Sequence, residues 1–364
     1  MTSRWTRRAI LQTGGVAVGG LLPAQQPRPT LPRPVRVGIL GLEGHFSEVL
    51  EAAKLLPEIQ IVAVAASKPR EVQRLAGNRA LAAAKRYDDY RRMLDAEKLD
   101  VVAICDENGR RAASVIACAE HGVAIAAEKP LAITLEELEA VRKSIARHNV
   151  RLTMLLPMRF DPSYLAMKAI VTGGEIGEPV ALGAQKSYKL GLERGQRPDW
   201  MRNRRTYGGT IPYIGIHMVD LMRWTSGREF VETAAFQSTV GFPQLGEMEN
   251  NTAVIYRMDN RGTANLRMDY LRPETAPTHG DDRLRIAGTK GVIEYQGGTL
   301  TLITATKKPH AITDLPRHPP LFVDFLDSLY NGKKHLIPLE DIYRVTEIVL
   351  RSREAAETNR IVRL

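Results

Sequence analysis

Cysteine is scarce in this sequence, which has only Cys105 and Cys118 among its 364 residues. Neither lies in a spacing typical of a metal site, so we predict no bound metal. Two alternatives remain for this pair. The two thiols form a disulfide in an oxidising compartment, or they are buried as small hydrophobic residues, which is the commoner outcome.

Acidic residues are absent from the first 36 positions, which carry six arginines. The formal net charge of +10 therefore leaves 10 − 6 = +4 for the rest of the chain, without any basic run. Binding to nucleic acid requires a basic patch or stripe, so this distribution argues against it. The sequence also shows no internal repeat, no low-complexity tract and no transmembrane segment after the N-terminal region.

The N-terminal region has the layout of an export signal. Arg7 and Arg8 precede a mild apolar run and then Pro23-Ala24-Gln25, which is the order of basic, apolar and cleavage regions. Adjacent arginines favour the twin-arginine route, and thus an exported, periplasmic protein with no stable membrane insertion after cleavage. The alternatives are a disordered basic tail or an uncleaved anchor, although the run is shorter than the ~20 residues of a bilayer span. We assign residues 1–33 to this signal and a proline-rich linker.

From Val35 onward, short apolar runs alternate with amphipathic segments. The predicted strands are VRVGIL, IQIVAVAA, LDVVAIC, VAIAAE and VRLTMLL, and residues 69–86 are taken as one helical segment. Strands that are buried on both faces and joined by helices form a parallel sheet. The sequence therefore predicts an α/β doubly wound, or Rossmann, dinucleotide-binding domain over residues 34–156.

The pattern changes after Pro157. The segment IPYIGIHMVDLMRWTSG predicts a helix that ends at Gly227. Alternating segments then predict long antiparallel strands, with a hairpin at residues 259–262 and two closing helices. Residues 157–364 are thus predicted to form an α+β domain with a large open, mainly antiparallel sheet. An uncovered face on such a sheet favours a homo-oligomer.

The segment AAEKPLA carries the first candidate site. Glu128, Lys129 and Pro130 directly follow a predicted strand, and strand ends face the ligand crevice in a doubly wound sheet. A lysine at this place can hydrogen-bond a substrate hydroxyl and hold positive charge near the reacting carbon. The alternative is an ordinary surface turn.

The segment IPYIGIHMVDLMRW carries the second candidate site. Tyr213 and His217 are four residues apart and share one helical face, with Asp220 on nearly the same side. Histidine is the natural general base near neutral pH, and the residue four positions earlier can orient it. The alternative is a histidine whose polar atoms are satisfied within the core.

The segment RPETAPTHGDDRLRI carries the third candidate site. His279, Asp281, Asp282 and Arg283 lie where a loop enters a predicted strand. Paired carboxylates beside a histidine favour hydroxyl recognition or a metal site, although a metal needs further converging ligands. A solvated turn is the alternative. We predict that His279 and Asp282 contact substrate.

The stretch VRVGILGLEGHF departs from the usual phosphate loop. Gly41 holds the tight-turn place, but Glu43 and Phe46 stand where the second and third glycines are expected. Gly38, Gly41 and Gly44 recur every three residues, which makes Gly44 the candidate replacement for the second glycine. We expect the Glu43 carboxylate to point away from the pyrophosphate or to weaken its binding.

Several ordered motifs together resemble the Gfo/Idh/MocA family, from about Val35 to the C-terminus. EKPLAITLEELEAV is similar to the family's EKP segment, and MRFDPSYLAMKAIVTGGEIGEPV to the segment that opens its second domain. GGTIPYIGIHMVDLMRWTSG is similar to its glycine-pair and His-x-x-Asp helix. IAGTKGVIEY and REAAETNRIVRL are similar to its late sheet and terminal patterns.

The resemblance implies that Lys129 is the catalytic lysine beside the nicotinamide and that His217 is the catalytic histidine. The family often has an aspartate four residues before that histidine, where this chain has Tyr213. Two expectations follow. Tyr213 supplies a hydroxyl in place of the missing carboxylate, or the activity of the protein is altered or lost. A second departure is ICDENGRR, where the family usually has a Thr-Pro pair and a later histidine.

Ser67, Lys68 and Arg70 follow the second predicted strand. An acidic residue there would bind the ribose hydroxyls of NAD, whereas small and basic residues suit the 2′-phosphate of NADP. We expect NADP or NAD, with NADP favoured; merely solvated side chains are the alternative. Ser67 and Lys68, together with Cys105 at the end of LDVVAIC, Glu128 and the three loop glycines, are the predicted cofactor contacts.

The leading functional hypothesis is an oxidoreductase that transfers hydride between a nicotinamide cofactor and a sugar, cyclitol or related polyol. Arg159 and Asp220 join His279 and Asp282 as predicted substrate contacts. A related enzyme that keeps its NAD bound and modifies glycosides by transient oxidation is the second hypothesis. A non-catalytic nucleotide- or sugar-binding relative is the third.

Overall fold

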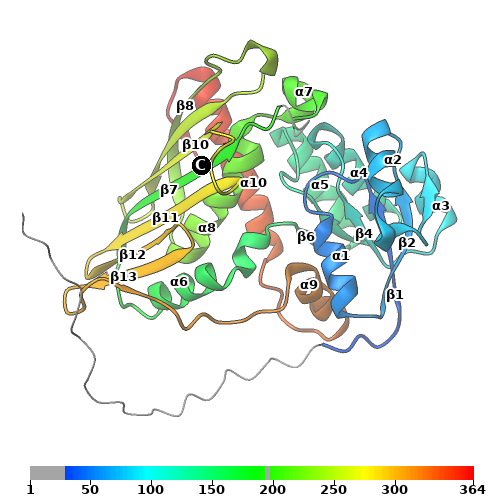
Figure 1. Ribbon diagram of the computed structural model, residues 1–364, viewed down its shortest axis with the longest axis horizontal. Coiled ribbons are helices and arrows are strands. Elements are labelled where there is room, and N and C mark those ends of the chain that lie inside the picture. The colour runs from blue at the N-terminus through cyan, green and yellow to red at the C-terminus, as the bar shows by residue number, and fades with distance from the viewer. Residues whose placement is uncertain (1–28, 193–196) are drawn as a thin grey trace, which may run out of the picture.

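The computed structural model describes residues 29–192 and 197–364. It contains two domains that lie side by side, an α/β domain at the right of Figure 1 and a large sheet with covering helices at the left. The predicted twin-arginine motif lies outside the described residues.

The first domain is built on a six-stranded parallel sheet in the order β3-β2-β1-β4-β5-β6. Its central strands are buried along almost their whole length because helices cover both faces. The strands are β1 (Val35–Leu40), β2 (Ile59–Ala65), β3 (Lys85–Tyr87), β4 (Val101–Ile104), β5 (Ala124–Ala127) and β6 (Leu152–Met154).

Helices alternate with these strands in the chain. They are α1 (Ser47–Leu55), α2 (Pro69–Ala76), α3 (Tyr90–Ala96), α4 (Asn108–Glu120) and α5 (Leu135–His148). The prediction of one helical segment over residues 69–86 is wrong. Helix α2 ends before Gly77, and Asn78 caps a short 3-10 turn by accepting a hydrogen bond from the Ala80 amide. The chain then adds the short edge strand β3.

The second domain is built on a nine-stranded sheet in the order β14-β13-β12-β11-β7-β10-β9-β8-β15. All neighbouring pairs are antiparallel except β7 and β10, which run parallel. The strands are β7 (Pro179–Lys189), β8 (Phe230–Ser238), β9 (Asn251–Met258), β10 (Thr263–Arg272), β11 (Gly280–Gly288), β12 (Gly291–Gln296), β13 (Thr299–Thr304), β14 (His310–Ala311) and β15 (Val362–Arg363).

Helices cover the face of this sheet that is turned toward the first domain (Figure 1). The helices on this face are α6 (Pro162–Thr172), α8 (Ile216–Ser226) and α10 (Leu339–Thr358); the short helix α7 (Arg204–Tyr207) contacts α4, and α9 (Leu321–Tyr330) precedes α10 in the chain. A π-helical turn, Ile211–Gly215, leads into α8. Helix α8 ends at Gly227 as predicted, with a φ of 68° and an amide that donates to the Arg223 carbonyl oxygen over 2.9 Å.

The predicted fold class is confirmed, and the hairpin at residues 259–262 joins β9 to β10. Helix α9 does not stay with the large sheet, because it returns to lie beside α1 of the first domain (Figure 1). Cys105 and Cys118 are both buried free thiols. They therefore pack as small hydrophobic residues and do not form the disulfide that was the alternative.

Candidate active site

The loop after β1 is shaped by two glycines with left-handed backbones. Gly41 has a φ of 73°, and a Cβ there would lie 2.5 Å from the Cys105 carbonyl oxygen. Gly44 has a φ of 60°, and a Cβ there would collide with the Glu128 carboxylate. Both positions therefore require glycine, so that the loop can lie against the ends of β4 and β5.

Gly38 and Cys105 serve the packing of the sheet rather than a ligand. Gly38 lies inside β1, where a Cβ would come 2.8 Å from the Leu99 Cδ1. The Cys105 side chain is fully buried, while its carbonyl oxygen accepts the Glu43 amide over 2.8 Å. The prediction that these two residues contact the cofactor is corrected accordingly, because the neighbouring chain occupies the space around them.

Glu43 turns away from the centre of the loop and toward α2. Its carboxylate lies 3.1 Å from the Arg74 Nη1 and 3.7 Å from the Arg70 Nε. Arg74 also hydrogen-bonds the Leu42 carbonyl oxygen. The Glu43 carboxylate of the variant phosphate loop is thus neutralised by two arginines of α2.

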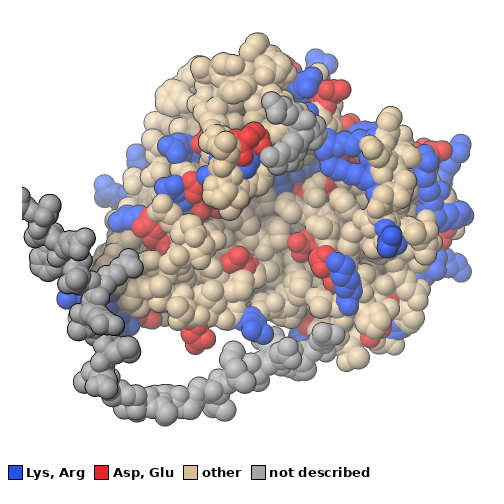
Figure 2. Space-filling view, in the orientation of Figure 1, with Lys and Arg blue, Asp and Glu red and all other residues tan. Residues whose placement is uncertain are grey.

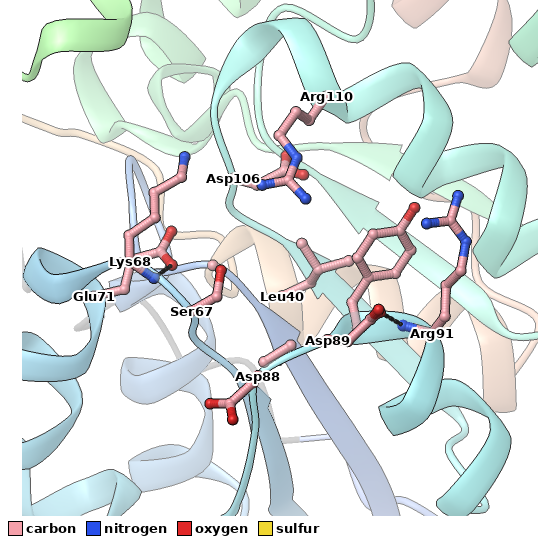
Figure 3. Close-up of a pocket in the computed structure, with 12 residues that line it drawn as sticks. Leu40, Ser67, Lys68, Glu71, Asp88, Asp89, Arg91, Asp106 and Arg110 are labelled. Carbon is pink, nitrogen blue, oxygen red and sulfur yellow. Dashed lines mark hydrogen bonds between the residues drawn. The ribbon is translucent and has the colours of Figure 1, made fainter.

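A pocket opens at the carboxyl ends of β1, β2 and β4 (Figure 3). Because strand order reverses at β1, this edge is where an open α/β sheet binds a nucleotide. The lining side chains are mainly polar and of both charges: Ser67, Lys68, Glu71, Asp88, Asp89, Arg91, Asp106 and Arg110. The position of this pocket and its polar lining fit the adenosine half of a dinucleotide.

Lys68 does not stand free in this pocket. Its Nζ donates a hydrogen bond of 2.6 Å to the Glu107 Oε2, and its backbone amide donates to Glu71. Beside it, Asp106 accepts a hydrogen bond from the Ser114 hydroxyl, while its Oδ1 is buried without a hydrogen-bond partner among the described residues. Burial raises the pKa of Asp106 to about 6.

Lys129 lies directly after β5 and is almost completely buried. Its Nζ donates a hydrogen bond of 2.7 Å to the Tyr213 carbonyl oxygen and lies 3.7 Å from the centre of the Tyr213 ring. Burial, with Arg111 and Lys186 adding to it, lowers the pKa of Lys129 to about 7. The amine therefore changes its protonation state near neutral pH, which is what a general base requires.

The π-helical turn and α8 bring Tyr213 and His217 to the same place. π-Helical turns are often found at functional sites, because the extra residue redirects side chains. His217 is buried, and its Nδ1 has no hydrogen-bond partner among the described residues. Burial, together with the charge of Lys129, lowers the pKa of His217 well below its ordinary value. We refer to Lys129, Tyr213 and His217 as the catalytic cluster.

His45 is a member of the site that the sequence reasoning missed. Its ring contacts the Glu128 carboxylate through Nδ1, and its amide donates to the Glu128 Oε1 over 2.7 Å. The His45 and His217 ring centres are 5.5 Å apart, edge to face. Burial raises the pKa of Glu128, but His45 and Lys129 outweigh burial and lower it to about 2. Its place in the loop that follows β1, at the edge of the sheet where ligands bind, could have identified His45 as a site residue.

Lys186 is the second residue that the sequence reasoning missed. It is 1% exposed on β7, and its Nζ donates a hydrogen bond of 2.8 Å to the Asp282 Oδ2 on β11. Lys186 and Asp282 are register partners in the sheet. The inward alternation of Ala184, Lys186 and Tyr188 along β7 could have identified this lysine.

The two aspartates at the start of β11 have different partners. Asp282 reaches the site through Lys186, whereas Asp281 forms an ion pair of 2.8 Å with Arg283. The His279 ring stacks on Tyr188 with centres 4.8 Å apart. Residues 29–192 and 197–364 contain no group of three or more His, Cys, Asp or Glu side chains that could hold a metal ion.

Arg159 and Asp220 bind each other instead of facing a ligand. Two hydrogen bonds of 2.7 and 2.6 Å join the guanidinium to the carboxylate, and both residues are almost fully buried. Asp341 of α10 adds a third carboxylate contact at 2.9 Å. The prediction that Arg159 and Asp220 contact substrate is corrected, since the pair joins the chain before α6 to α8 and α10.

Comparison with known proteins places this geometry in a family. Residues 35–156 match the oxidoreductase family with an NAD-binding Rossmann fold, and residues 164–294 match the GFO/IDH/MocA C-terminal domain. A solved structure from Thermotoga maritima is 33% identical with a TM-score of 0.85, over 91% of this chain and 100% of that one.

Two inositol 2-dehydrogenases are also similar to this chain. Myo-inositol 2-dehydrogenase of Thermotoga maritima is 26% identical, over 71% of this chain and 74% of the relative. Scyllo-inositol 2-dehydrogenase (NAD(+)) of Bacillus subtilis is 27% identical, over 71% of this chain and 73% of the relative. With both of its domains matched, this chain belongs to the GFO/IDH/MocA family of NAD-binding Rossmann oxidoreductases.

Proposed function

We propose that this protein oxidises a secondary hydroxyl of a sugar, cyclitol or related polyol, with NAD+ as the hydride acceptor. The observation that carries the proposal is the contact of Lys129, at the end of β5, with the turn that holds Tyr213 and leads to His217, in a chain whose parallel sheet also carries a nucleotide-type pocket. The similarity to two inositol 2-dehydrogenases supports a polyhydroxylated ring as the substrate. A bound nicotinamide would supply the carbon that receives the hydride.

Lys129 acts as the base in this proposal. A neutral amine accepts the hydroxyl proton as the hydride leaves the carbinol carbon, so that the alcohol becomes a carbonyl. With a pKa of about 7, the amine is largely neutral above pH 7 and ready for that step. Its hydrogen bond to the Tyr213 carbonyl oxygen fixes the direction from which it meets the substrate.

His217 acts as a neutral imidazole, because its pKa lies well below its ordinary value. It can hold the substrate oxygen through a ring N–H, and it does not compete with Lys129 as a cation. Burial raises the pKa of the Tyr213 phenol, so this residue stays protonated. Tyr213 therefore does not replace the charge of the aspartate that the family often has there; its ring face supports the Lys129 ammonium instead.

The cofactor we propose is NAD rather than NADP. Lys68, which follows β2 where a 2′-phosphate would lie, is paired with Glu107 at 2.6 Å. Arg70 lies 3.7 Å from Glu43. Both cations that favoured NADP on sequence grounds are thus neutralised by carboxylates of the protein, and a dianionic phosphate would have to displace them or be repelled by them.

We propose export by the twin-arginine route to the periplasm. The support is the order of Arg7-Arg8, an apolar run and a cleavage region that contains Ala24. Among the described residues, no helix has the length and apolarity needed to cross a membrane. Fractionation of cells that produce the full chain, with mass determination of the mature N-terminus, tests this. Retention of the intact chain in the cytoplasm would contradict it, and Arg7→Lys with Arg8→Lys should block export.

We propose a homo-oligomer that uses the outer face of the large sheet. Phe236 on β8 and Ile255 on β9 lie on the same face and are 71% and 59% exposed. Light scattering during size-exclusion chromatography should give a mass above one chain for the wild type and a lower mass for Phe236→Ser with Ile255→Ser. A monomeric wild type would contradict the proposal.

The activity is tested with purified protein, NAD+ and a panel of inositols, aldoses and their glycosides. Absorbance of the reduced nicotinamide should rise with at least one panel member, and Lys129→Met and His217→Asn should each remove the signal. Lys143→Met is the matched control, because Lys143 is an exposed residue of α5 whose partner is Glu139. Failure of the wild type to bind NAD+ by calorimetry would refute the proposal.

A further inference from the structure

A groove lies beside the catalytic cluster, between α6, the strands β11 and β12, and the start of α9. Its volume is about 530 Å³. Figure 2 shows the surface hollowed between the two domains, with acidic side chains on the walls of the hollow. Helices α1, α6 and α9 surround this region in Figure 1. The groove is large enough to hold a sugar-sized ring in addition to the ring that reacts at the catalytic cluster.

Aromatic side chains form part of the groove wall. Tyr164 and Tyr295 lie with ring centres 4.9 Å apart, and Phe160 and His318 with ring centres 5.3 Å apart. Tyr295 and His318 are only partly buried, so part of each ring is open to the groove. Sugar rings place their apolar C–H faces on such side chains, in the mostly apolar and aromatic lining typical of small-molecule sites.

Carboxylates form a second part of the wall, beside proline, methionine and leucine side chains. Glu48, Asp161 and Asp282 line the groove, and its described lining residues include no lysine or arginine. Ionised carboxylates are acceptors only, so they favour a ligand that offers many hydroxyl donors. The charges of Glu48 and Asp161 repel an anionic ligand such as a sugar acid, whereas that of Asp282 is balanced by Lys186.

Two polar atoms at the groove have no hydrogen-bond partner among the described residues. They are the hydroxyl of Tyr164, which is 2% exposed, and the Oδ1 of Asp282. Buried polar groups are almost always paired, and an exception calls for an explanation such as a bound ligand or water. Both residues line the groove, so unsatisfied hydrogen-bonding capacity lies within its wall.

Lys186 connects the groove to the catalytic cluster. Its Nζ lies 2.8 Å from the Asp282 Oδ2 and 3.3 Å from the Met158 Sδ, and both of these residues line the groove. The Lys186 charge also contributes to the low pKa of His217 and of Lys129. The same ammonium group therefore contacts two residues of the groove wall and lies near enough to Lys129 and His217 to act on their charge.

We propose that this groove binds a second, uncharged polyhydroxylated ring that is joined to the ring being oxidised. The substrate of this protein is then a glycoside or disaccharide rather than a single sugar or inositol. The inference rests on the proposed function, because it places the reacting ring at the catalytic cluster.

The test measures binding in the presence of NAD+, by calorimetry, so that it does not depend on turnover. The probes are glucose, galactose and xylose, and the α- and β-linked disaccharides of each. At least one disaccharide should bind about tenfold more tightly than its own monosaccharide, which corresponds to about 1.4 kcal/mol. Tyr295→Ala should remove that advantage and leave the affinity for the monosaccharide unchanged.

Tyr330→Ala is the matched control, because Tyr330 lies at the far end of α9 and packs against Arg33. It should keep the preference for the disaccharide. The inference is overturned if no disaccharide binds more tightly than its monosaccharide, or if the preference survives Tyr295→Ala. A disaccharide preference without any oxidation would instead refute the proposed function and leave the groove assignment intact.

Discussion

Removing the Glu107 carboxylate should open the protein to NADP. Lys68 donates a hydrogen bond of 2.6 Å to Glu107, and the two side chains are 31% and 13% exposed. Glu107→Gln leaves Lys68 available for a 2′-phosphate and removes one negative charge that would repel it. A hydrogen bond to a charged group contributes about 1.5–3 kcal/mol. Since Lys68 is partly solvated, the lower part of this range applies.

The expected result is an affinity for NADP+ about 10- to 30-fold higher than in the wild type, from about 1.4 kcal/mol per tenfold. The affinity for NAD+ should change by less than about threefold, because NAD has no 2′-phosphate for Lys68 to bind. Calorimetric titration with each nucleotide measures both. Glu139→Gln removes an exposed carboxylate that pairs with Lys143 on α5, and it should change neither affinity. Unchanged affinity for NADP+ in Glu107→Gln would refute the reasoning.

Three further predictions concern the base, the buried ion pair and the variant loop. In the oxidative direction, kcat/KM should rise with pH through about 7 as Lys129 loses its proton, and a profile without this limb would contradict the role of Lys129. Arg159→Met leaves the Asp220 carboxylate buried without its partner, and chemical denaturation should show a loss of about 3–5 kcal/mol in the free energy of unfolding. Glu43→Gly frees Arg74 for the phosphates, so calorimetry should show equal or tighter binding of NAD+; clear weakening would show that Glu43 stabilises the loop.

The parallel sheet could be predicted from the sequence because its strands carry a strong local signal. Apolar runs such as residues 101–104 are buried on both faces and are separated by amphipathic helices. The edge strand β3 has exposed residues and no such pattern. The sequence pattern therefore predicts helix through β3, although Gly77 and Asn78 indicate that the helix ends before it.

The meeting of Lys129, Tyr213 and His217 could be anticipated only in part. Helical spacing placed Tyr213 and His217 on one face, and the position after a strand placed Lys129 in the ligand crevice. Contacts between distant segments left no local signal. His45 pairs with Glu128 inside the first domain and Lys186 with Asp282 inside the second, and each pair joins segments that are about 80 to 100 residues apart in the sequence.

Pairing also explains the predictions that the structure corrects. Arg159 and Asp220 are charged residues that sequence reasoning assigned to a substrate, but the structure buries them against each other. Lys68 is a cation next to the cofactor pocket, and our proposal of NAD depends on its pairing with Glu107 at the junction of β4 and α4. The sequence shows which charges exist, whereas their partners decide which remain available to a ligand.

The central claim is that hydride passes from a substrate carbinol carbon to a nicotinamide at the catalytic cluster. Its most direct test supplies NAD+ and panel sugars or inositols that carry deuterium on their carbinol carbons, and examines the nucleotide by mass spectrometry. We predict that the reduced nucleotide carries the deuterium, and that Lys129→Met abolishes the transfer. Reduced nucleotide without deuterium, or no reduced nucleotide with any panel member, would contradict the account.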